Sequence, residues 1–387
     1  MLIFIFHRLL EKGVQLERVL ITGGAGFIGS HLADLMISRG YAVRAFDSLE
    51  PQVHGPSGRR PAYLHDAVEL VVGDVRDAGA VDRALEGCSM LVHFAAAVGV
   101  GQSMYEMQRY TSVNALGAAC VLEQAAGRAS SIRRMLVASS MSIYGEGLYD
   151  CPSCGRVAPR LRAAERLSER RWEVPCPNCG GECSPVPTPE TKPLYPTSIY
   201  AVNKRDHEEM FLAVGEAYGI PTVAMRFFNV YGTRQALSNP YTGVGAIFAS
   251  RLLNGKPPVI FEDGRQSRDF IHVSDIARAC LLALESDVSG EVFNVGTGRP
   301  TSVLDMACGL ARKLGRSEEF EIRNQYRAGD IRHCYADSGK AEAMLGFKAS
   351  IAFEDGLDEL VEWVRTCTAA DLVDTATREL ADRGLTR

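Results

Sequence analysis

The sequence has no apolar run approaching the roughly 20 residues that cross a bilayer, and it has no surplus of positive charge. Its 42 Lys and Arg residues are outnumbered by 47 Asp and Glu residues, which gives a net charge of -5. A general nucleic-acid binder needs a basic surplus to displace counterions from phosphates. We therefore expect no membrane and no nucleic acid among its partners. The 46% of hydrophobic and 23% of charged residues are typical of a folded globular protein and exclude disordered, collagen-like and coiled-coil chains.

Residues 1–17 lack the features of a secretory signal. No basic region precedes their apolar stretch, and no small-residue cleavage site follows it. We interpret them as an N-terminal extension, because the first predicted strand begins at Arg18. Most of the eleven cysteines are scattered singly, which favours buried thiols in a reducing compartment and thus a cytoplasmic protein.

Short apolar runs alternate with helical stretches through the first half of the chain. The strands that this pattern predicts are 18–22, 42–47, 68–74, 90–95, 133–140 and 222–228. The helices that it predicts are 27–39, 79–87, 104–127 and 199–217. Strands that are apolar on both faces and separated by helices indicate an α/β fold, a Rossmann-type doubly wound parallel sheet covered by helices on both sides.

The pattern also suggests how the chain is divided. We predict a Rossmann domain at 18–228 and a smaller C-terminal α/β lobe at 229–387, some segments of which return to the Rossmann domain. Residues 146–190, rich in Pro, Cys, Arg and Glu, interrupt the alternation. We call residues 146–190 the Cys-rich insertion.

A glycine-rich loop follows the first predicted strand and opens the first helix. Gly23, Gly26 and Gly29 stand in a G-x-x-G-x-x-G spacing, which lets the chain turn tightly and lets a pyrophosphate approach the backbone at a helix N-terminus. Asp47 ends the second strand, where a carboxylate binds ribose hydroxyls and repels a 2′-phosphate. Asp74 ends the third strand and is placed either to accept from an adenine amino group or to cap the strand end. These features predict an NAD-binding domain, with NAD favoured over NADP.

A tyrosine, a lysine and a serine form a candidate catalytic trio. Tyr200 and Lys204 are four residues apart on a predicted helix, so they share one face. The ammonium is expected to lower the pKa of the phenol toward neutrality, as a general base requires. Ser140 ends a strand; it is placed either to hydrogen-bond the same substrate oxygen or to be satisfied by the backbone.

In this order along the chain, these residues resemble the extended short-chain dehydrogenase/reductase family, and more closely its nucleotide-sugar epimerases. The resemblance covers about 18–366, apart from the insertion. Six further motifs carry it: GDVRD (73–77), HFAA (93–96), RFFNVYG (226–232), SRDFIHVSD (267–275), FNVGTG (293–298) and RAGDIRHCYAD (327–337). It implies a nucleotide-sugar 4-epimerase that works through a transient 4-keto sugar with tightly bound NAD, and a substrate-binding role for the C-terminal lobe.

The resemblance also implies roles for individual residues. Tyr200 would be the base, Lys204 its partner and a ligand of the nicotinamide ribose, and Ser140 a second hydrogen-bonding group. Asn114 would reach Lys204 through a water molecule, or make only a buried polar contact. The implied NAD contacts are Gly23, Gly26, Phe27, Ile28, Gly29, Asp47, Asp74, Val75, Phe94, Ala95, Ala96, Asn114, Tyr200 and Lys204. The implied contacts of the nucleotide-diphosphate sugar are Ser103, Ser140, Asn229, Arg268 and Arg327.

Two positions after Ser140 bear on the reaction within this family. Related 4,6-dehydratases carry an Asp-Glu pair there, and related decarboxylases a nearby Glu, whereas this chain has Met141 and Ser142. Epimerisation is therefore favoured, with an NAD(P)-dependent 4-ketoreductase as the alternative and a non-enzymatic NAD-binding regulator as the less favoured one. The resemblance also implies a homodimer formed by the helices at 104–127 and 199–217.

Two C-x-x-C pairs occupy the Cys-rich insertion. Cys151, Cys154, Cys176 and Cys179 have the spacing of a four-thiolate site, which suits a structural Zn²⁺ in a zinc ribbon. Disulfides or free thiols are the alternative, and a nucleic-acid-binding ribbon is disfavoured by the lack of net positive charge. The insertion lies between Ser140 and Tyr200, so we expect it near the mouth of the active site. Within the epimerases, such an insertion together with the motifs SLEPQVHG (48–55) and VGVGQSMYE (98–106) resembles the subgroup of dTDP-L-rhamnose 4-epimerases.

Overall fold

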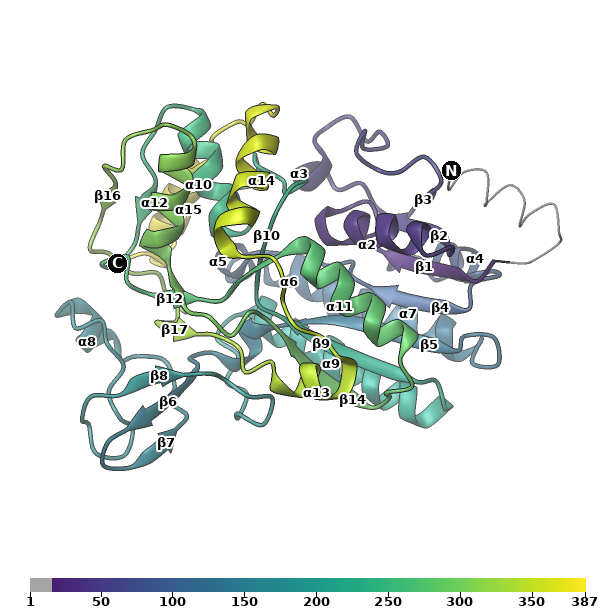
Figure 1. The fold of residues 1–387 in the computed structure, drawn as a ribbon, viewed down its shortest axis with the longest axis horizontal. Helices are drawn as coiled ribbons and strands as arrows, with labels where there is room; N and C mark the ends of the chain where they lie inside the picture. Colours follow the sequence, from purple (N-terminus) through teal and green to yellow (C-terminus); the bar gives the residue numbers. More distant parts are fainter. Residues whose placement is uncertain (1–15) are drawn as a thin grey trace.

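The computed structural model describes residues 16–387, so the predicted extension at 1–17 lies almost wholly outside the described residues. A seven-stranded sheet forms its centre (Figure 1). All of its strands run parallel, in the order β14-β9-β5-β4-β1-β2-β3. The strands are β1 (Arg18–Thr22), β2 (Ala42–Asp47), β3 (Glu69–Val72), β4 (Met90–His93), β5 (Arg134–Ser140), β9 (Thr222–Phe227) and β14 (Glu291–Val295). The expectation of a doubly wound parallel sheet is confirmed.

Helices cover both faces of this sheet because its strands are apolar on both sides. In β1, Val19 and Ile21 face one core and Leu20 faces the other. Helices α2 (Phe27–Ser38) and α11 (Val273–Glu285) pack on the first face (Figure 1). The other face carries α4 (Ala78–Leu85), α7 (Gly117–Ala126) and α9 (Ile199–Tyr218). No helix within residues 16–387 is long and apolar enough to span a membrane.

The single helix predicted over 104–127 is wrong in one respect, because a π-helical turn interrupts it. The order is α6 (Met107–Thr111), a π turn at Ser112–Leu116 and then α7. Inside the turn, the Asn114 side chain accepts from the Ala97 N–H at 2.7 Å and donates to the Ala97 carbonyl at 3.1 Å. The Asn114 side chain thus binds the π turn to the neighbouring loop. A π turn holds one residue more than a regular helical turn, and apolar periodicity does not reveal it.

A smaller lobe with its own apolar core lies at one end of the sheet (Figure 1). Its short strands are β10 (Asn229–Tyr231), β11 (Val259–Ile260), β12 (Ser267–Arg268), β13 (Phe270–His272), β15 (Thr301–Ser302), β16 (Glu321–Ile322) and β17 (His333–Cys334). Its helices are α10 (Val244–Leu253), α12 (Val303–Lys313), α14 (Phe353–Arg365) and α15 (Val373–Asp382). From the same half of the chain, α11, β14 and α13 (Gly339–Leu345) pack with the main sheet instead.

The Cys-rich insertion forms a small unit beside this lobe (Figure 1). Strand β6 (Leu148–Cys151) pairs antiparallel with both β7 (Gly155–Val157) and β8 (Ser184–Val186), and a short helix α8 (Ala164–Ser168) follows β7. Its apolar centre is small and includes two of the cysteines. The remaining short helices of the described chain are α3 (Pro51–His54), α5 (Val100–Ser103) and a 3₁₀ turn at Met141–Tyr144.

Candidate active site

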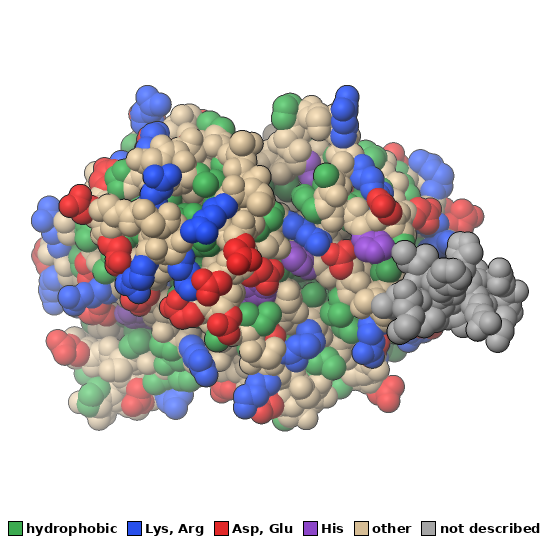
Figure 2. All heavy atoms as spheres, turned by 45° about the horizontal axis from the view of Figure 1, so that its top comes forward, with side chains coloured by type: hydrophobic (Ala, Val, Ile, Leu, Met, Phe, Trp, Pro, Cys, Tyr) green, Lys and Arg blue, Asp and Glu red, His purple; other side chains and the backbone are tan. Residues whose placement is uncertain are grey.

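The carboxyl ends of the main strands open onto one cavity of about 670 Å³, a size typical of small-molecule sites. Figure 2 shows the surface indented between the smaller lobe and the rest of the molecule. All three catalytic candidates line this cavity, as do all predicted NAD contacts except Asn114 and all predicted substrate contacts except Ser103. The fold thus brings together residues that are up to three hundred positions apart in the sequence.

The glycine loop leaves room for a ligand against its backbone. Gly23 has a φ of +68°, and a Cβ on it would lie 2.8 Å from the Ala95 nitrogen. A Cβ on Gly29 would collide with the Gly23 carbonyl oxygen. Helix α2 begins directly after this loop, so its free N–H groups face the same space. This cradle fits the pyrophosphate of a dinucleotide.

Two aspartates at strand ends flank the glycine loop. Asp47 accepts from the backbone N–H groups of Ala25 and Leu49, each at 3.0 Å, and it lines the cavity. Asp74 accepts from the Arg76 N–H at 2.9 Å, and the Arg76 guanidinium holds the pKa of the Asp74 carboxyl below its usual range. Asp74 therefore makes the strand-end cap considered from sequence, while it also lines the cavity.

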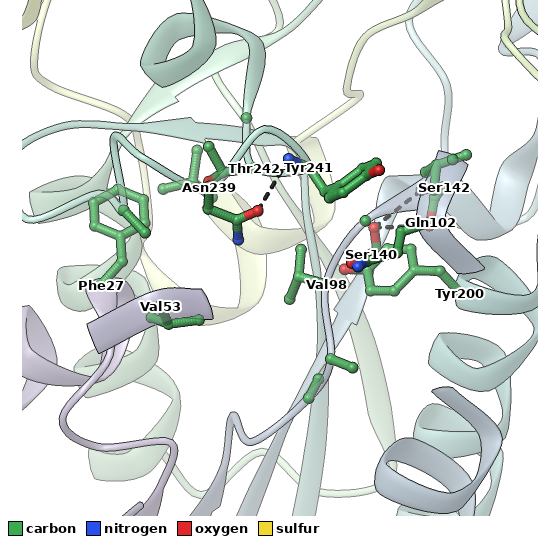
Figure 3. A pocket seen from close by; sticks show the side chains of 18 of the residues that line it. Phe27, Val53, Val98, Gln102, Ser140, Ser142, Tyr200, Asn239, Tyr241 and Thr242 are labelled. Atoms are coloured by element: carbon green, nitrogen blue, oxygen red, sulfur yellow. Dashed lines mark hydrogen bonds between the residues drawn. The ribbon is translucent and has the colours of Figure 1, made fainter. Parts of the chain in front are cut away.

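The catalytic candidates gather at the opposite end of the cavity. Figure 3 shows Ser140, Tyr200 and Gln102 close together, whereas Phe27 and Val53 lie at the far side of the pocket. Ser140 lies beside the Tyr200 phenol, and its hydroxyl acts to lower the pKa of that phenol. The Ser140 hydroxyl accepts from the Ser142 N–H at 3.2 Å and from the Ser142 hydroxyl at 2.9 Å. The serine is thus held by its neighbour and directed at the phenol.

The expectation that Lys204 lowers the pKa of Tyr200 does not hold in the structure. Burial raises the pKa of Tyr200 to about 12, against a smaller lowering by the hydrogen bond from Ser140. Burial also lowers the pKa of Lys204 to about 7. The Lys204 ammonium donates to the Ala138 carbonyl at 3.0 Å. Desolvation disfavours both charged forms and outweighs the attraction that the i, i+4 spacing suggested.

Two predicted ligands have other partners in the structure. Ser103 is fully buried behind the cavity wall; its hydroxyl donates to the Val100 carbonyl at 2.7 Å and accepts from the Tyr200 N–H at 3.1 Å. It therefore anchors the start of α9, and we withdraw it as a substrate contact. The Asn114 side chain hydrogen-bonds the backbone of Ala97 through both its oxygen and its nitrogen. It therefore makes a buried polar contact, which was the alternative to a water-mediated contact with Lys204. The Asn114 carbonyl accepts from His207 Nε2 at 3.0 Å, and His207 Nδ1 lies 3.5 Å from the Lys204 ammonium.

Cationic side chains face the cavity from the smaller lobe. The Arg268 guanidinium donates to the carbonyls of Ile331 at 2.7 Å and Arg332 at 2.9 Å. These carbonyl partners are neutral, so they leave the charge of Arg268 available. Arg327 pairs with Asp330 at 2.8 Å. Asn229 contributes a buried side-chain oxygen that has no hydrogen-bond partner among the described residues. An anionic ligand with donor groups fits this set.

A sequence profile of the NAD dependent epimerase/dehydratase family matches residues 19–159 and 179–296, which is more than half of the chain. The chain belongs to this family. It is 35% identical to a dTDP-L-rhamnose 4-epimerase of Burkholderia thailandensis over 90% of this chain and 95% of that one. Homologues of this kind are enzymes that act on nucleotide sugars.

Solved structures agree with the family assignment. A UDP-glucose 4-epimerase of Thermotoga maritima, solved with UDP-glucose, has a TM-score of 0.74 and 30% identity, covering 90% of this chain and 99% of that one. A UDP-glucose 4-epimerase of Thermus thermophilus, solved in complex with NAD, has a TM-score of 0.71 and 29% identity, covering 91% of this chain and 100% of that one.

Sequence reasoning missed several residues of this epimerase/dehydratase site. Gln102 lines the cavity beside the trio, and it lies in a motif, VGVGQSMYE, from which only Ser103 was chosen. Tyr241 and Phe261 also line the cavity, and the Arg327 guanidinium lies 4.7 Å from the Phe261 ring centre. Tyr241 lies in an irregular loop, and no pattern in the sequence indicated it.

Four of the five cysteines of the insertion, Cys151, Cys154, Cys176 and Cys179, lie together, apart from the cavity. Their Sγ atoms are all within 4.8 Å of one another. Cys151 and Cys179 are 3.6 Å apart, too far for a disulfide of about 2 Å. A tetrahedral ion with metal–sulfur distances of about 2.3 Å separates its sulfurs by about 3.8 Å, so the arrangement fits zinc. All eleven cysteines of the chain are unpaired.

The burial of Lys204 predicts how its removal changes stability. Below about pH 7 the charge of Lys204 must be desolvated in the folded protein, whereas above the ordinary lysine pKa of about 10.4 the side chain is neutral in both the folded and the unfolded state. Between these values the unfolded chain binds a proton that the native state does not, so stability rises with pH. Lys204→Met should therefore raise the Tm of NAD-free protein, more at about pH 6 than at about pH 9.

Thermal unfolding at the two pH values measures this difference. Arg205→Met, one residue along the same helix and with its side chain 42% exposed, is the control and should show no such pH dependence. An equal gain at both pH values, or a loss at the lower one, would contradict the desolvation of Lys204.

Proposed function

We propose that this protein is a nucleotide-sugar 4-epimerase that keeps NAD bound during turnover. One observation carries the proposal: Ser140, Tyr200 and Lys204 share a cavity with the glycine loop at one end and the charge of Arg268 at the other. A dinucleotide and a nucleotide-diphosphate sugar can thus meet at the trio. The relatives that act on UDP-glucose and dTDP-L-rhamnose support this assignment.

The side chains suit proton transfer at the sugar 4-hydroxyl. NAD, when bound, supplies the hydride acceptor and donor. Tyr200 takes the 4-hydroxyl proton as C4 is oxidised and returns it when C4 is reduced from its other face, so the overall reaction is redox-neutral. Ser140 would hydrogen-bond the phenol and the sugar oxygen, and Lys204, in its charged form, would favour the phenolate.

The remaining cavity residues suit the other parts of the two ligands. The glycine loop, with Phe27 and Ile28, would hold the pyrophosphate of NAD, and Asp47 its adenine ribose. Asp74 and Val75 would contact the adenine, and the segment 94–96 the nicotinamide half. Arg268 and Arg327 would bind the diphosphate of the sugar nucleotide, and Asn229 a donor group of it.

The residues directly after Ser140 distinguish the alternative reactions. Met141 and Ser142 offer no carboxyl group, so neither can protonate a leaving hydroxyl as a dehydratase requires. A 4-ketoreductase would use the same trio with an exchangeable cofactor, and it is the second candidate. The Cys-rich insertion and the Burkholderia relative favour a dTDP-6-deoxyhexose such as dTDP-L-rhamnose as substrate. A cytoplasmic location is part of the proposal.

The proposal predicts turnover without added cofactor. Purified protein should epimerise at least one UDP-hexose or dTDP-6-deoxyhexose at C4, as measured by chromatography of the sugars. Tyr200→Phe should keep its NAD and lose roughly 10²–10⁴-fold in kcat, because the proton acceptor is gone. Tyr218→Phe, at the exposed end of the same helix, should retain activity. Stoichiometric consumption of NAD(P)H by wild type would support the ketoreductase instead.

We also propose that Cys151, Cys154, Cys176 and Cys179 bind a structural Zn²⁺, about one per chain. Four thiolates would close the coordination sphere and supply folding free energy to a unit with little apolar centre. Cys151→Ser combined with Cys176→Ser should release the metal and expose residues 146–190 to proteolysis, while NAD binding survives. Elemental analysis measures the zinc. Cys183→Ser is the control and should keep it; an absence of zinc from wild type would exclude the site.

The third proposal is a homodimer through α9 and the π turn. Leu116 is 58% exposed and Val202 is 40% exposed on neighbouring helical segments, although both are large apolar residues. A two-fold contact would bury both. Light scattering at micromolar concentration should give a dimer mass for wild type and a monomer mass for Leu116→Glu combined with Val202→Glu. Met344→Glu, exposed on α13, should remain dimeric, and a monomeric wild type would rule the contact out.

A further inference from the structure

A buried ion cluster joins the Cys-rich insertion to the smaller lobe. From the insertion, the Arg162 guanidinium donates to both oxygens of Glu262, at 2.8 and 3.0 Å. From the lobe, Arg332 donates to Glu262 at 3.0 Å and to Asp263 at 2.6 and 3.0 Å, and its guanidinium is closed off by Glu173 of the insertion at 2.6 Å. The side chains of Arg162, Glu262 and Arg332 are almost completely buried.

Glu262 occupies a backbone position that side chains disfavour. Its φ is +53°, in the left-handed region where glycine is the usual residue. Its N–H donates to the Gln325 carbonyl at 2.7 Å, which fixes the turn. A strained residue that also buries a charge persists only where its surroundings demand it. At position 262 these surroundings are the guanidinium groups of Arg162 and Arg332, which both donate to the Glu262 carboxylate.

The same cluster holds the segment 330–333 from the side opposite to the cavity. Arg162 donates to the Asp330 carbonyl at 3.2 Å. Glu146 of the insertion accepts from the N–H groups of Arg332 at 2.8 Å and His333 at 3.3 Å. On its cavity side, the segment presents the carbonyls of Ile331 and Arg332 to the Arg268 guanidinium.

The segment also connects to the second cation of the cavity. The Asp330 carboxylate accepts from Arg327 at 2.8 Å. Phe261, which lies under the Arg327 guanidinium, directly precedes Glu262. The insertion therefore touches the backbone that orients both arginines, although none of its own cation–anion pairs lines the cavity.

We infer that Arg162 and Glu262 are positioning residues, which lock the insertion onto the segment 330–333 and so set Arg268 and Arg327 for the diphosphate of the substrate. This rests on the proposed function. Affinity for the nucleoside-diphosphate part then depends on a contact outside the cavity, while NAD binding and the trio do not. Because the ion pairs are buried between insertion and lobe, they are not available to a macromolecular partner.

The test separates positioning from stability. Arg162→Met removes the fork, keeps most of the side-chain volume and leaves the four cysteines in place. We expect KM for the nucleotide sugar and Kd for UDP or dTDP, measured by calorimetry on the NAD-bound protein, to rise about tenfold, with kcat within about threefold and zinc and NAD contents unchanged. Arg162→Lys should recover part of the affinity, because the lysine restores the positive charge beside Glu262. The recovery should be incomplete, because one ammonium cannot reach both Glu262 and the Asp330 carbonyl. Arg156→Met, exposed on β7, is the matched control.

A double variant makes the distinction sharper. Arg162→Met with Glu262→Gly removes the buried carboxylate that has lost its Arg162 partner and keeps only Arg332. It also places glycine at the left-handed position, so Tm should recover in part while the weak binding of nucleoside diphosphate persists. Recovery of affinity together with Tm would show that the pair serves stability alone and would overturn the inference. Unchanged affinity in Arg162→Met would overturn it as well. If wild type binds no nucleoside diphosphate, the proposed function fails, and the inference fails with it.

Discussion

The parallel direction of the seven main strands is the constraint on which the site depends. Because every strand ends at the same edge of the sheet, the glycine loop after β1, Asp47 at the end of β2 and Ser140 at the end of β5 share one rim. The order β5-β4-β1-β2 places the reversal of connections between β4 and β1, where a crevice opens. The helix α9 begins at this rim, with Tyr200 as its second residue, because the chain after β5 must cross back over the sheet before it can form β9 parallel to β5.

Buried groups that are held by the backbone give the cavity its electrostatic character. Arg268 is held by backbone carbonyls, which orient a cation without cancelling its charge. The carboxylate of Asp47 lies at the other end, bound to backbone N–H groups. A ligand with ribose hydroxyls at one end and phosphates at the other meets complementary groups only in one orientation.

The elements that sequence predicted well are those fixed by local pattern. The strand β1 and the start of α2 follow from an apolar run and a glycine spacing, and both were placed to the residue. The predicted lowering of the Tyr200 pKa was wrong, because the i, i+4 spacing indicates which side chains are neighbours on a helix and does not indicate how deeply they are buried. The π turn around Asn114, the burial of Ser103 and the role of Glu262 depend on contacts with distant segments. Such contacts leave no periodicity, so only the folded chain reveals them.

The Cys-rich insertion shows why a buried ion cluster can suit a site better than an apolar interface. The free energy lost in desolvating Arg162, Arg332 and Glu262 offsets most of the free energy gained from their mutual attraction. The cluster therefore contributes little to stability. Paired guanidinium and carboxylate groups nevertheless tolerate little displacement, because each hydrogen bond depends on distance and angle. A small displacement of one apolar surface along another costs less free energy, because apolar contacts are not directional. An insertion can therefore use buried charges to fix its orientation against the smaller lobe, which is the basis of the role we propose for Arg162 and Glu262.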